Sequence, residues 1–227
     1  MSRSPFRNSF ADSNLARRGI LAAGLACGGA AVLPGPLAAA LLATPRQTEG
    51  PFYPLELPLD SDNDLVTVEG RGQPAAGIVT HVFGRVLDEA GKPVAGARVE
   101  IWQCDGFGRY HHPGDRGGQA DPNFQGFGRM AVDAEGGYRF RTIKPVPYPG
   151  RTPHIHFAIS GAGIERLTTQ MYVAGEPLNA RDFILNRVRD PAARGRLIVP
   201  LETAPQIEPG ALAGRFDIVL DKRLFRG

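Results

Sequence analysis

The sequence predicts an all-β fold, an antiparallel β-sandwich with one short helix and an irregular N-terminal arm. Residues 81–227 contain many short runs in which apolar and polar residues alternate, which is the period of a half-buried strand. Turns rich in glycine and proline separate these runs, and only one stretch has helical spacing. Short strands with frequent turns are typical of sandwiches.

Residues 1–43 are expected to be an export leader. Arg17 and Arg18 directly precede residues 19–43, which contain no charged side chain and many Gly and Ala residues. This pattern is typical of a twin-arginine signal. The segment is also long enough to span a bilayer, but its prolines and glycines disfavour a stable span. We therefore expect an exported, periplasmic protein, with a retained membrane anchor or a lipidated Cys27 as the alternatives.

The chain after this leader is electrically neutral. Residues 1–43 hold four of the 26 Lys and Arg residues and one of the 23 Asp and Glu residues, which leaves 22 of each. Because no basic patch remains, no nucleic-acid partner is expected. Cys104 is the only cysteine left, so the core rather than a disulfide must hold the fold.

An irregular arm is expected over residues 44–80. It contains the string TEGPFYP at residues 48–54, and Pro51, Pro54 and Pro58 together exclude a helix there. Phe52 and Tyr53 are costly to leave in water, so the arm is expected to be ordered.

The sandwich core is expected over residues 81–227. Strands are predicted at residues 81–87, 97–102, 129–132, 138–143, 154–160, 167–173, 197–201 and 215–220. The one helix is predicted at residues 180–188, with Asn179 as its N-cap and with Phe183, Ile184 and Val188 facing inward.

The string HIH places two histidines on one face of a predicted strand. His154 and His156 are two residues apart, and strand side chains alternate between faces, so both imidazoles point the same way. The pair alone fits either a metal site or the polar face of an edge strand. Tyr148 and Arg151, in the connection that leads into this strand, favour the metal site.

Four longer motifs carry a resemblance to a known family. They are TEGPFYP at 48–54, GRVLDEAGKPVAGARVEIWQCDGFGRY at 84–110, GRMAVDAEGGYRFRTIKPVPYPGRTPHIHF at 128–157 and LTTQMYV at 167–173. In this order they resemble the intradiol ring-cleavage dioxygenases, which include protocatechuate 3,4-dioxygenase and the catechol 1,2-dioxygenases.

The resemblance implies a non-haem ferric ion as the cofactor. Its four ligands would be Tyr110, Tyr148, His154 and His156. Phenolate is a hard anionic donor that suits a trivalent ion, imidazole suits iron, and no thiolate is offered for a soft metal. Arg151 matches the active-site arginine of the family, and Gln170 matches its glutamine.

The resemblance also implies the reaction. A small aromatic diol and O2 would be the substrates, and a cis,cis-muconate-type diacid would be the product. Tyr148 would accept one of the two protons that a catechol loses on binding. Arg151 would stabilise negative charge on the activated ring, and Gln170 would help to orient it.

The connection between Tyr148 and His154 departs from the family pattern. Only five residues lie between them, fewer than in the well-known enzymes, which predicts a more open or differently closed pocket. The TEGPFYP string resembles the segment that approaches the pocket, so Gly50 and Pro51 are expected beside the substrate. The sequence leaves open which catechol is used and whether the chain forms an oligomer, and it predicts membrane contact only through an uncleaved leader.

A second hypothesis is a transthyretin-like β-sandwich that acts as a stalk or binding module without catalysis, because GRVLDEAGKPVAGARVEIW is also typical of such modules. The combination of two tyrosines and two histidines favours the enzyme, since a stalk does not need it. Of the other conspicuous residues, His111 and His112 are expected to be exposed, His81 to be structural, Trp102 to pack beneath the site and Cys104 to be buried.

Overall fold

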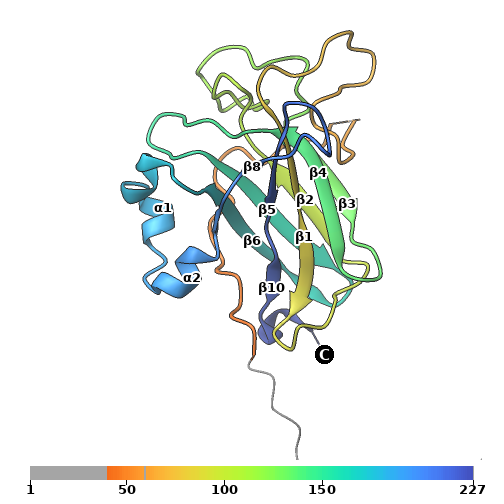
Figure 1. The fold of residues 1–227 in the computed structure, drawn as a ribbon, viewed down its shortest axis with the longest axis vertical. Coiled ribbons are helices and arrows are strands. Elements are labelled where there is room, and N and C mark those ends of the chain that lie inside the picture. Colours follow the sequence, from red (N-terminus) through yellow and green to blue (C-terminus); the bar gives the residue numbers. More distant parts are fainter. Residues whose placement is uncertain (1–39, 59, 227) are drawn as a thin grey trace, which may run out of the picture. The chain divides into compact units, whose positions relative to one another are not determined.

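The computed structural model describes residues 40–58 and 60–226 and consists mostly of strands (Figure 1), as expected for an all-β chain. The strands are β1 (Val79–Asp88), β2 (Arg98–Trp102), β3 (Phe127–Ala131), β4 (Gly137–Ile143), β5 (His154–Gly161), β6 (Ile164–Val173), β7 (Ile198–Val199), β8 (Glu202–Thr203), β9 (Leu212–Arg215) and β10 (Ile218–Leu220). All but the last four residues of the expected leader, 1–43, lie outside the described part of the chain.

The helical elements are short. They are α1 (Phe183–Asn186), α2 (Pro191–Gly195) and two 3-10 turns, η1 (Pro177–Ala180) and η2 (Lys222–Leu224). The prediction of a single helix at residues 180–188 is therefore wrong, because α1 fills only part of that range, η1 ends where it begins and α2 follows it. Among the described residues, none of these elements is long and apolar enough to span a membrane.

The predicted start of the helix at Asn179 is also wrong. Asp182 is the N-cap of α1, and its carboxylate accepts hydrogen bonds from the backbone N–H groups of Ile184 and Leu185. Both of these residues are buried, whereas Phe183 is exposed and does not face inward as predicted. Asn179 instead accepts a hydrogen bond from the Thr152 hydroxyl and donates one to the Val173 carbonyl at the end of β6.

The first sheet is organised around β1. This strand pairs antiparallel with β4 from Val79 to Arg85, and it pairs in parallel with β9 and β10. β8 pairs antiparallel with β9 at the end of the sheet.

The second sheet has the strand order β3-β2-β5-β6-β7, and only its β6–β7 pair is parallel. The predicted antiparallel arrangement is therefore confirmed only in part, because most strand pairs are antiparallel but both sheets also contain parallel pairs. Between β6 and β7 the chain passes through α1 and α2, and such a helical crossover lets the next strand run in the same direction.

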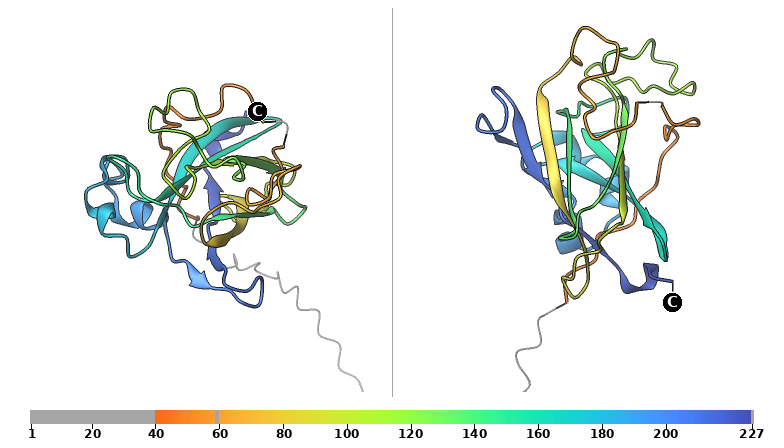
Figure 2. Two further views of the ribbon diagram at one scale, coloured as in Figure 1. Left: turned by 90° about the horizontal axis from the view of Figure 1, so that it is seen from above. Right: turned by 90° about the vertical axis from the view of Figure 1, so that its right-hand side faces the viewer.

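The two faces of the second sheet differ. Ile155, Phe157 and Ile159 of β5 are fully buried in the main core, where the Phe157 ring lies 5.0 Å from that of Phe216 beside the first sheet. The alternate β5 residues point to the other face. The N-terminal arm passes beside this sheet (Figure 2), and Gln47 N–H donates to the Thr168 carbonyl of β6 at 2.8 Å. The face of β5 that carries the predicted metal ligands His154 and His156 is therefore turned toward the arm.

Candidate metal centre

His154 and His156 lie on the face of β5 that is turned away from the main core. Both are at most 2% exposed, and their Nε2 atoms are only 3.1 Å apart. Strand register sets what surrounds them: His156 lies between Trp102 of β2 and Gln170 of β6. The Trp102 ring stacks on the His156 ring with centroids 4.8 Å apart, so Trp102 packs directly against the site.

The hydrogen bonds of His154 define its tautomer. Its Nδ1 lies 2.6 Å from the Thr152 carbonyl, which can only accept, so Nδ1 carries the proton and Nε2 has a free lone pair. Burial, followed by the Arg151 charge, lowers the pKa of His154 to about 4. Burial and His154 lower the pKa of His156 well below its usual value. Both imidazoles are thus neutral at pH 7, which is the form that binds metals.

Tyr110 reaches the site from the loop after β2. Its backbone N–H donates to Asp115 Oδ2 at 2.7 Å, which anchors the loop, and its side chain is 5% exposed. The Tyr110 ring centroid lies 5.6 Å from that of Tyr148 and 6.4 Å from that of His156. The buried Tyr110 hydroxyl has no hydrogen-bond partner among the described residues.

Tyr148 and Arg151 are the two ends of one tight turn. Arg151 N–H donates to the Tyr148 carbonyl at 2.9 Å, and Gly150 has a φ of 82°, as a type II turn with proline at its second position requires. The Tyr148 ring centroid lies 5.5 Å from that of His154. This turn therefore places a phenol and a guanidinium side by side next to the histidines.

The four side chains fit a hard cation. Burial raises the pKa of Tyr148, and it raises the pKa of Tyr110 well above the usual value, so a phenolate here needs a positive charge nearby. Two neutral imidazole nitrogens and an unpartnered phenol offer such a cation donors in one buried space. The described residues contain no group of three or more His, Cys, Asp and Glu side chains that could hold a metal ion, so any metal here depends on the tyrosines.

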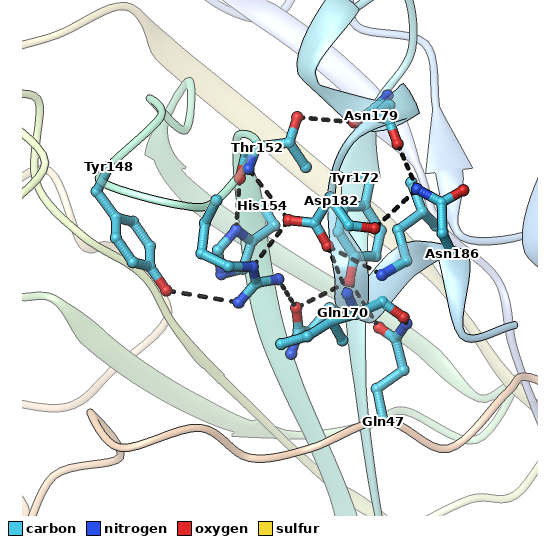
Figure 3. A network of polar contacts seen from close by, with 12 residues as sticks. Gln47, Tyr148, Thr152, His154, Gln170, Tyr172, Asn179, Asp182 and Asn186 are labelled. Carbon is cyan, nitrogen blue, oxygen red and sulfur yellow. Dashed lines mark hydrogen bonds and ion pairs between the residues drawn. The ribbon is translucent and has the colours of Figure 1, made fainter.

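Arg151 is held by three partners, Tyr148, Gln170 and Asp182, which are labelled in Figure 3. It is 8% exposed; its Nε donates to Asp182 Oδ2 at 2.8 Å and its Nη2 to Gln170 Oε1 at 2.6 Å. Its Nη1 lies 3.5 Å from the Tyr148 hydroxyl. Burial acts to lower the pKa of Arg151, but the hydrogen bond to Asp182 together with the charges of Tyr148 and Asp182 outweighs it, so the pKa is raised. The guanidinium is therefore charged and fixed in orientation.

Asp182 is a site residue that sequence reasoning missed. Besides capping α1, it accepts a hydrogen bond from Thr152 N–H at 3.1 Å, so one carboxylate anchors the helix, Arg151 and the start of β5. The available signal was an Asp directly ahead of the apolar run Phe-Ile-Leu, which is an N-cap pattern. Its second partner, Arg151, is 31 positions away and gave no local signal.

The arm supplies the other side of the site. Gly50 adopts a φ of 75°, and a Cβ there would lie 3.3 Å from His156 Cε1. Pro51, the other expected substrate neighbour, is exposed. Phe52 was not predicted at the site, yet its ring stacks on Tyr110 with centroids 4.6 Å apart. Gln170 Nε2 donates to the Thr48 carbonyl at 3.0 Å, which ties the arm to β6.

The remaining conspicuous residues are two histidines and Cys104, which packs in the same hydrophobic cluster as Tyr110. His111 is exposed as expected, whereas His112 is half-buried, with its ring 5.7 Å from that of Phe52. Cys104 is buried, and burial raises the pKa of its thiol to about 12. A cavity of about 840 Å³ borders Tyr110, but Arg151, His154 and His156 do not line it, so it lies beside the cluster.

Comparisons with known proteins point to one family. A model of the Dioxygenase family matches residues 48–222. The protocatechuate 3,4-dioxygenase beta chain of Burkholderia cepacia is 46% identical over 189 residues, which cover 78% of this chain and 79% of that protein. Catechol 1,2-dioxygenase 1 of Acinetobacter lwoffii is 33% identical over 176 residues, which cover 70% of this chain but only 53% of that longer protein.

A solved structure is similar as well. It is the dioxygenase domain of a dioxygenase carbohydrate-binding protein fusion from Streptomyces sp. SirexAA-E. The TM-score is 0.59 at 34% identity, and the match covers 79% of this chain and 98% of that domain.

Proposed function

The chain belongs to the intradiol ring-cleavage dioxygenase family, and on this basis we propose that it cleaves a catechol-type ring between the two hydroxylated carbons at a non-haem Fe(III) centre. The supporting observation is the cluster described above, whose proposed ligands are Tyr110, Tyr148, His154 and His156. The product would be a cis,cis-muconate-type diacid. Family membership does not favour the stalk or binding module.

The proposed ion fits the chemistry of these side chains. When bound, a ferric ion would supply a Lewis acid for the two catechol oxygens and a route for electrons from the ring to O2. Two neutral imidazoles and two phenolates would leave it one net positive charge. The unpartnered Tyr110 hydroxyl would then gain the partner that its burial demands.

Proton transfer is assigned to Tyr148. Burial favours its neutral phenol, so its oxygen is suited to hold one of the protons that the diol loses. The Arg151 Nη1, 3.5 Å from that oxygen, would stabilise the negative charge left on the ring. Both ends of the Gln170 amide are occupied, by Arg151 and by the Thr48 carbonyl, so Gln170 would orient the arginine and the arm.

The substrate is proposed as a small aromatic diol together with O2. Gly50 approaches His156, and the turn at Tyr148 to Arg151 leads directly into β5, so the ring would lie between the arm and this turn. Pro51 would contact the outer edge of that space.

The test is oxygen uptake by iron-loaded protein with a panel of catechols, followed by identification of the product. We expect uptake with at least one catechol and a diacid from intradiol cleavage. His156→Ala should abolish uptake, and the matched control His111→Ala, on an exposed imidazole near the site, should retain it. No uptake with any catechol, or a product of extradiol cleavage, would contradict the proposal.

We also propose export through the twin-arginine route, on the basis of Arg17 and Arg18 ahead of an uncharged segment. This route carries folded proteins, so iron could be inserted before transport. Fractionation of cells that express the full chain tests the idea. Wild type should reach the periplasm and a double Arg→Lys variant at these positions should not, whereas wild type found solely in the cytoplasm with its leader intact would exclude export.

A further inference from the structure

Glu100 of β2 is a buried carboxylate that the proposed reaction does not use. It is 4% exposed and lies two residues before Trp102, so both side chains are on the site face of the sheet. Its Oε2 accepts a hydrogen bond from the Tyr53 hydroxyl at 3.1 Å and lies 3.2 Å from Arg166 Nη1. Both partners come from distant segments, the arm and β6.

Arg166 contacts the arm at two residues, Glu49 and Tyr53. Its Nη2 donates to Glu49 Oε2 at 2.9 Å, and its guanidinium carbon lies 4.6 Å from the centroid of the Tyr53 ring, a cation–π distance. Burial acts to lower the pKa of Arg166, but its hydrogen bond to Tyr53 and the charge of Glu100 raise it, so it stays charged. One arginine thus holds the arm residues on either side of the Gly50–Phe52 segment.

The segment between these two points is the part of the arm that meets the site. Gly50 lies against His156 and Phe52 stacks on Tyr110. Tyr53 also packs edge-on against Trp102, with ring centroids 5.0 Å apart. Any movement of Glu49 or Tyr53 away from Arg166 would therefore carry the intervening residues away from the site.

We propose that Glu100, Arg166 and Tyr53 form an arm clamp, a set of positioning residues that hold residues 48–53 closed over the site. The inference rests on the proposed function, because it assigns to the clamp the retention of the diol. Within the described part of the chain, no side-chain hydrogen bond or ion pair joins the clamp residues to the proposed ligands or to Arg151. Loss of the clamp should therefore weaken substrate binding and leave the chemical step intact.

Kinetics of Arg166→Met test this split. The variant keeps the length of the side chain but loses both ion pairs, so KM should rise roughly tenfold while kcat stays within about twofold, the pattern of lost uniform binding. Glu100→Gln should shift KM in the same direction. Its matched control is Glu165→Gln. Glu165 also forms an ion pair with the arm, to Arg46, but this pair is exposed and lies outside residues 48–53. The control should leave KM unchanged.

A second measurement needs no activity. In metal-free protein, Arg166→Met should speed amide hydrogen exchange in residues 48–53 and not in β5. Trp102 is the only tryptophan, so the fluorescence of the protein reports on its surroundings. The emission maximum should shift to longer wavelength when Tyr53 moves away and exposes the Trp102 ring to water. Tyr53→Phe, which removes only a hydroxyl, provides a milder variant if Arg166→Met does not fold.

The outcomes separate this inference from the proposed function. If amide hydrogen exchange in residues 48–53 is not faster and KM is unchanged, in folded Arg166→Met or in folded Tyr53→Phe, the clamp is overturned. A fall in kcat equal to the change in kcat/KM would also overturn it, since the residues would then act on the chemical step. If wild type oxidises no catechol, the proposed function fails. The exchange measurement then still decides whether the clamp exists: faster exchange in residues 48–53 of the variant supports it, and unaltered exchange overturns it.

Discussion

Asp182→Asn should destabilise the protein far more than its conservative shape suggests. The carboxylate is fully buried and accepts four hydrogen bonds, from Arg151 Nε, from Thr152 N–H and from the N–H groups of the second and third residues of α1. Asparagine offers one acceptor oxygen. If that oxygen caps the helix, the amide NH2 faces the Arg151 and Thr152 donors, and the buried guanidinium loses its counter-charge.

The size of the effect follows from these contacts. Removing one partner of a buried ion pair costs about 3–5 kcal/mol, and Arg151 keeps Gln170 and Tyr148 as partial compensation. We therefore expect a loss of about 3 kcal/mol in the free energy of unfolding. For a chain of this size that corresponds to a decrease in Tm of roughly 6–12 °C.

The measurement is urea unfolding of metal-free protein, followed by Trp102 fluorescence, with the same m-value expected for both proteins. Asp190→Asn is the matched control. Asp190 caps α2 through Ala192 N–H in the same way, but it is exposed and lacks a buried arginine partner. Because Asn caps helices about as well as Asp, the control should change stability by less than about 0.5 kcal/mol.

The comparison can refute the reasoning directly. If Asp182→Asn and Asp190→Asn lose the same stability, Asp182 acts only as a helix cap and the buried pair with Arg151 contributes nothing measurable. A large loss accompanied by a changed m-value would instead indicate an altered denatured state.

Two further predictions concern the ligands and the acid stability. Tyr110→Phe should remove most of the bound iron and of the red-brown tyrosinate absorption. The control is Tyr138→Phe, at a buried tyrosine outside the site, which should keep both. Full iron occupancy and an unchanged spectrum in Tyr110→Phe would show that the ligand assignment is wrong. The hydrogen bond from Arg141 lowers the pKa of Glu208 from 4.5 to about 2. Because the folded-state value is the lower one, this pair stabilises the native state above pH 4.5, and its contribution is lost as the pH falls toward 2. Allowing for solvent screening, wild type should lose about 1 kcal/mol more than Glu208→Gln over that range, and equal losses on acid titration of urea stability would contradict the assignment.

The features that the sequence predicted are those that local rules decide. His154 and His156 share a face because strand side chains alternate, and that holds whichever strands lie beside β5. The order of Phe52 was expected because an aromatic ring is costly in water. Its partner, Tyr110, is 58 positions away and could not be identified from the arm alone.

The errors arose where tertiary contacts choose between equal local options. Asn179 and Asp182 are both good N-cap residues, and the buried Arg151 decides in favour of the one that carries a charge. The pairing of strands is another case that local rules do not decide. The alternation of apolar and polar residues shows which side chains face inward, but not which strands pair or in which direction they run. The parallel pairs of β1 and β6 were therefore beyond local reasoning.

The parallel pairs of β1 have a consequence for how the chain folds. Thr80 pairs with Leu212 and Val86 with Ile218, so each contact closes a loop of 132 positions. Such distant pairing makes folding slow, since the entropy of loop closure must be met before the contacts form. Until β9 and β10 are synthesised, one edge of β1 has no partner and offers an unprotected strand for aggregation. A nascent chain that pauses before residue 212 is thus expected to aggregate more readily than a complete chain, in which this edge is paired.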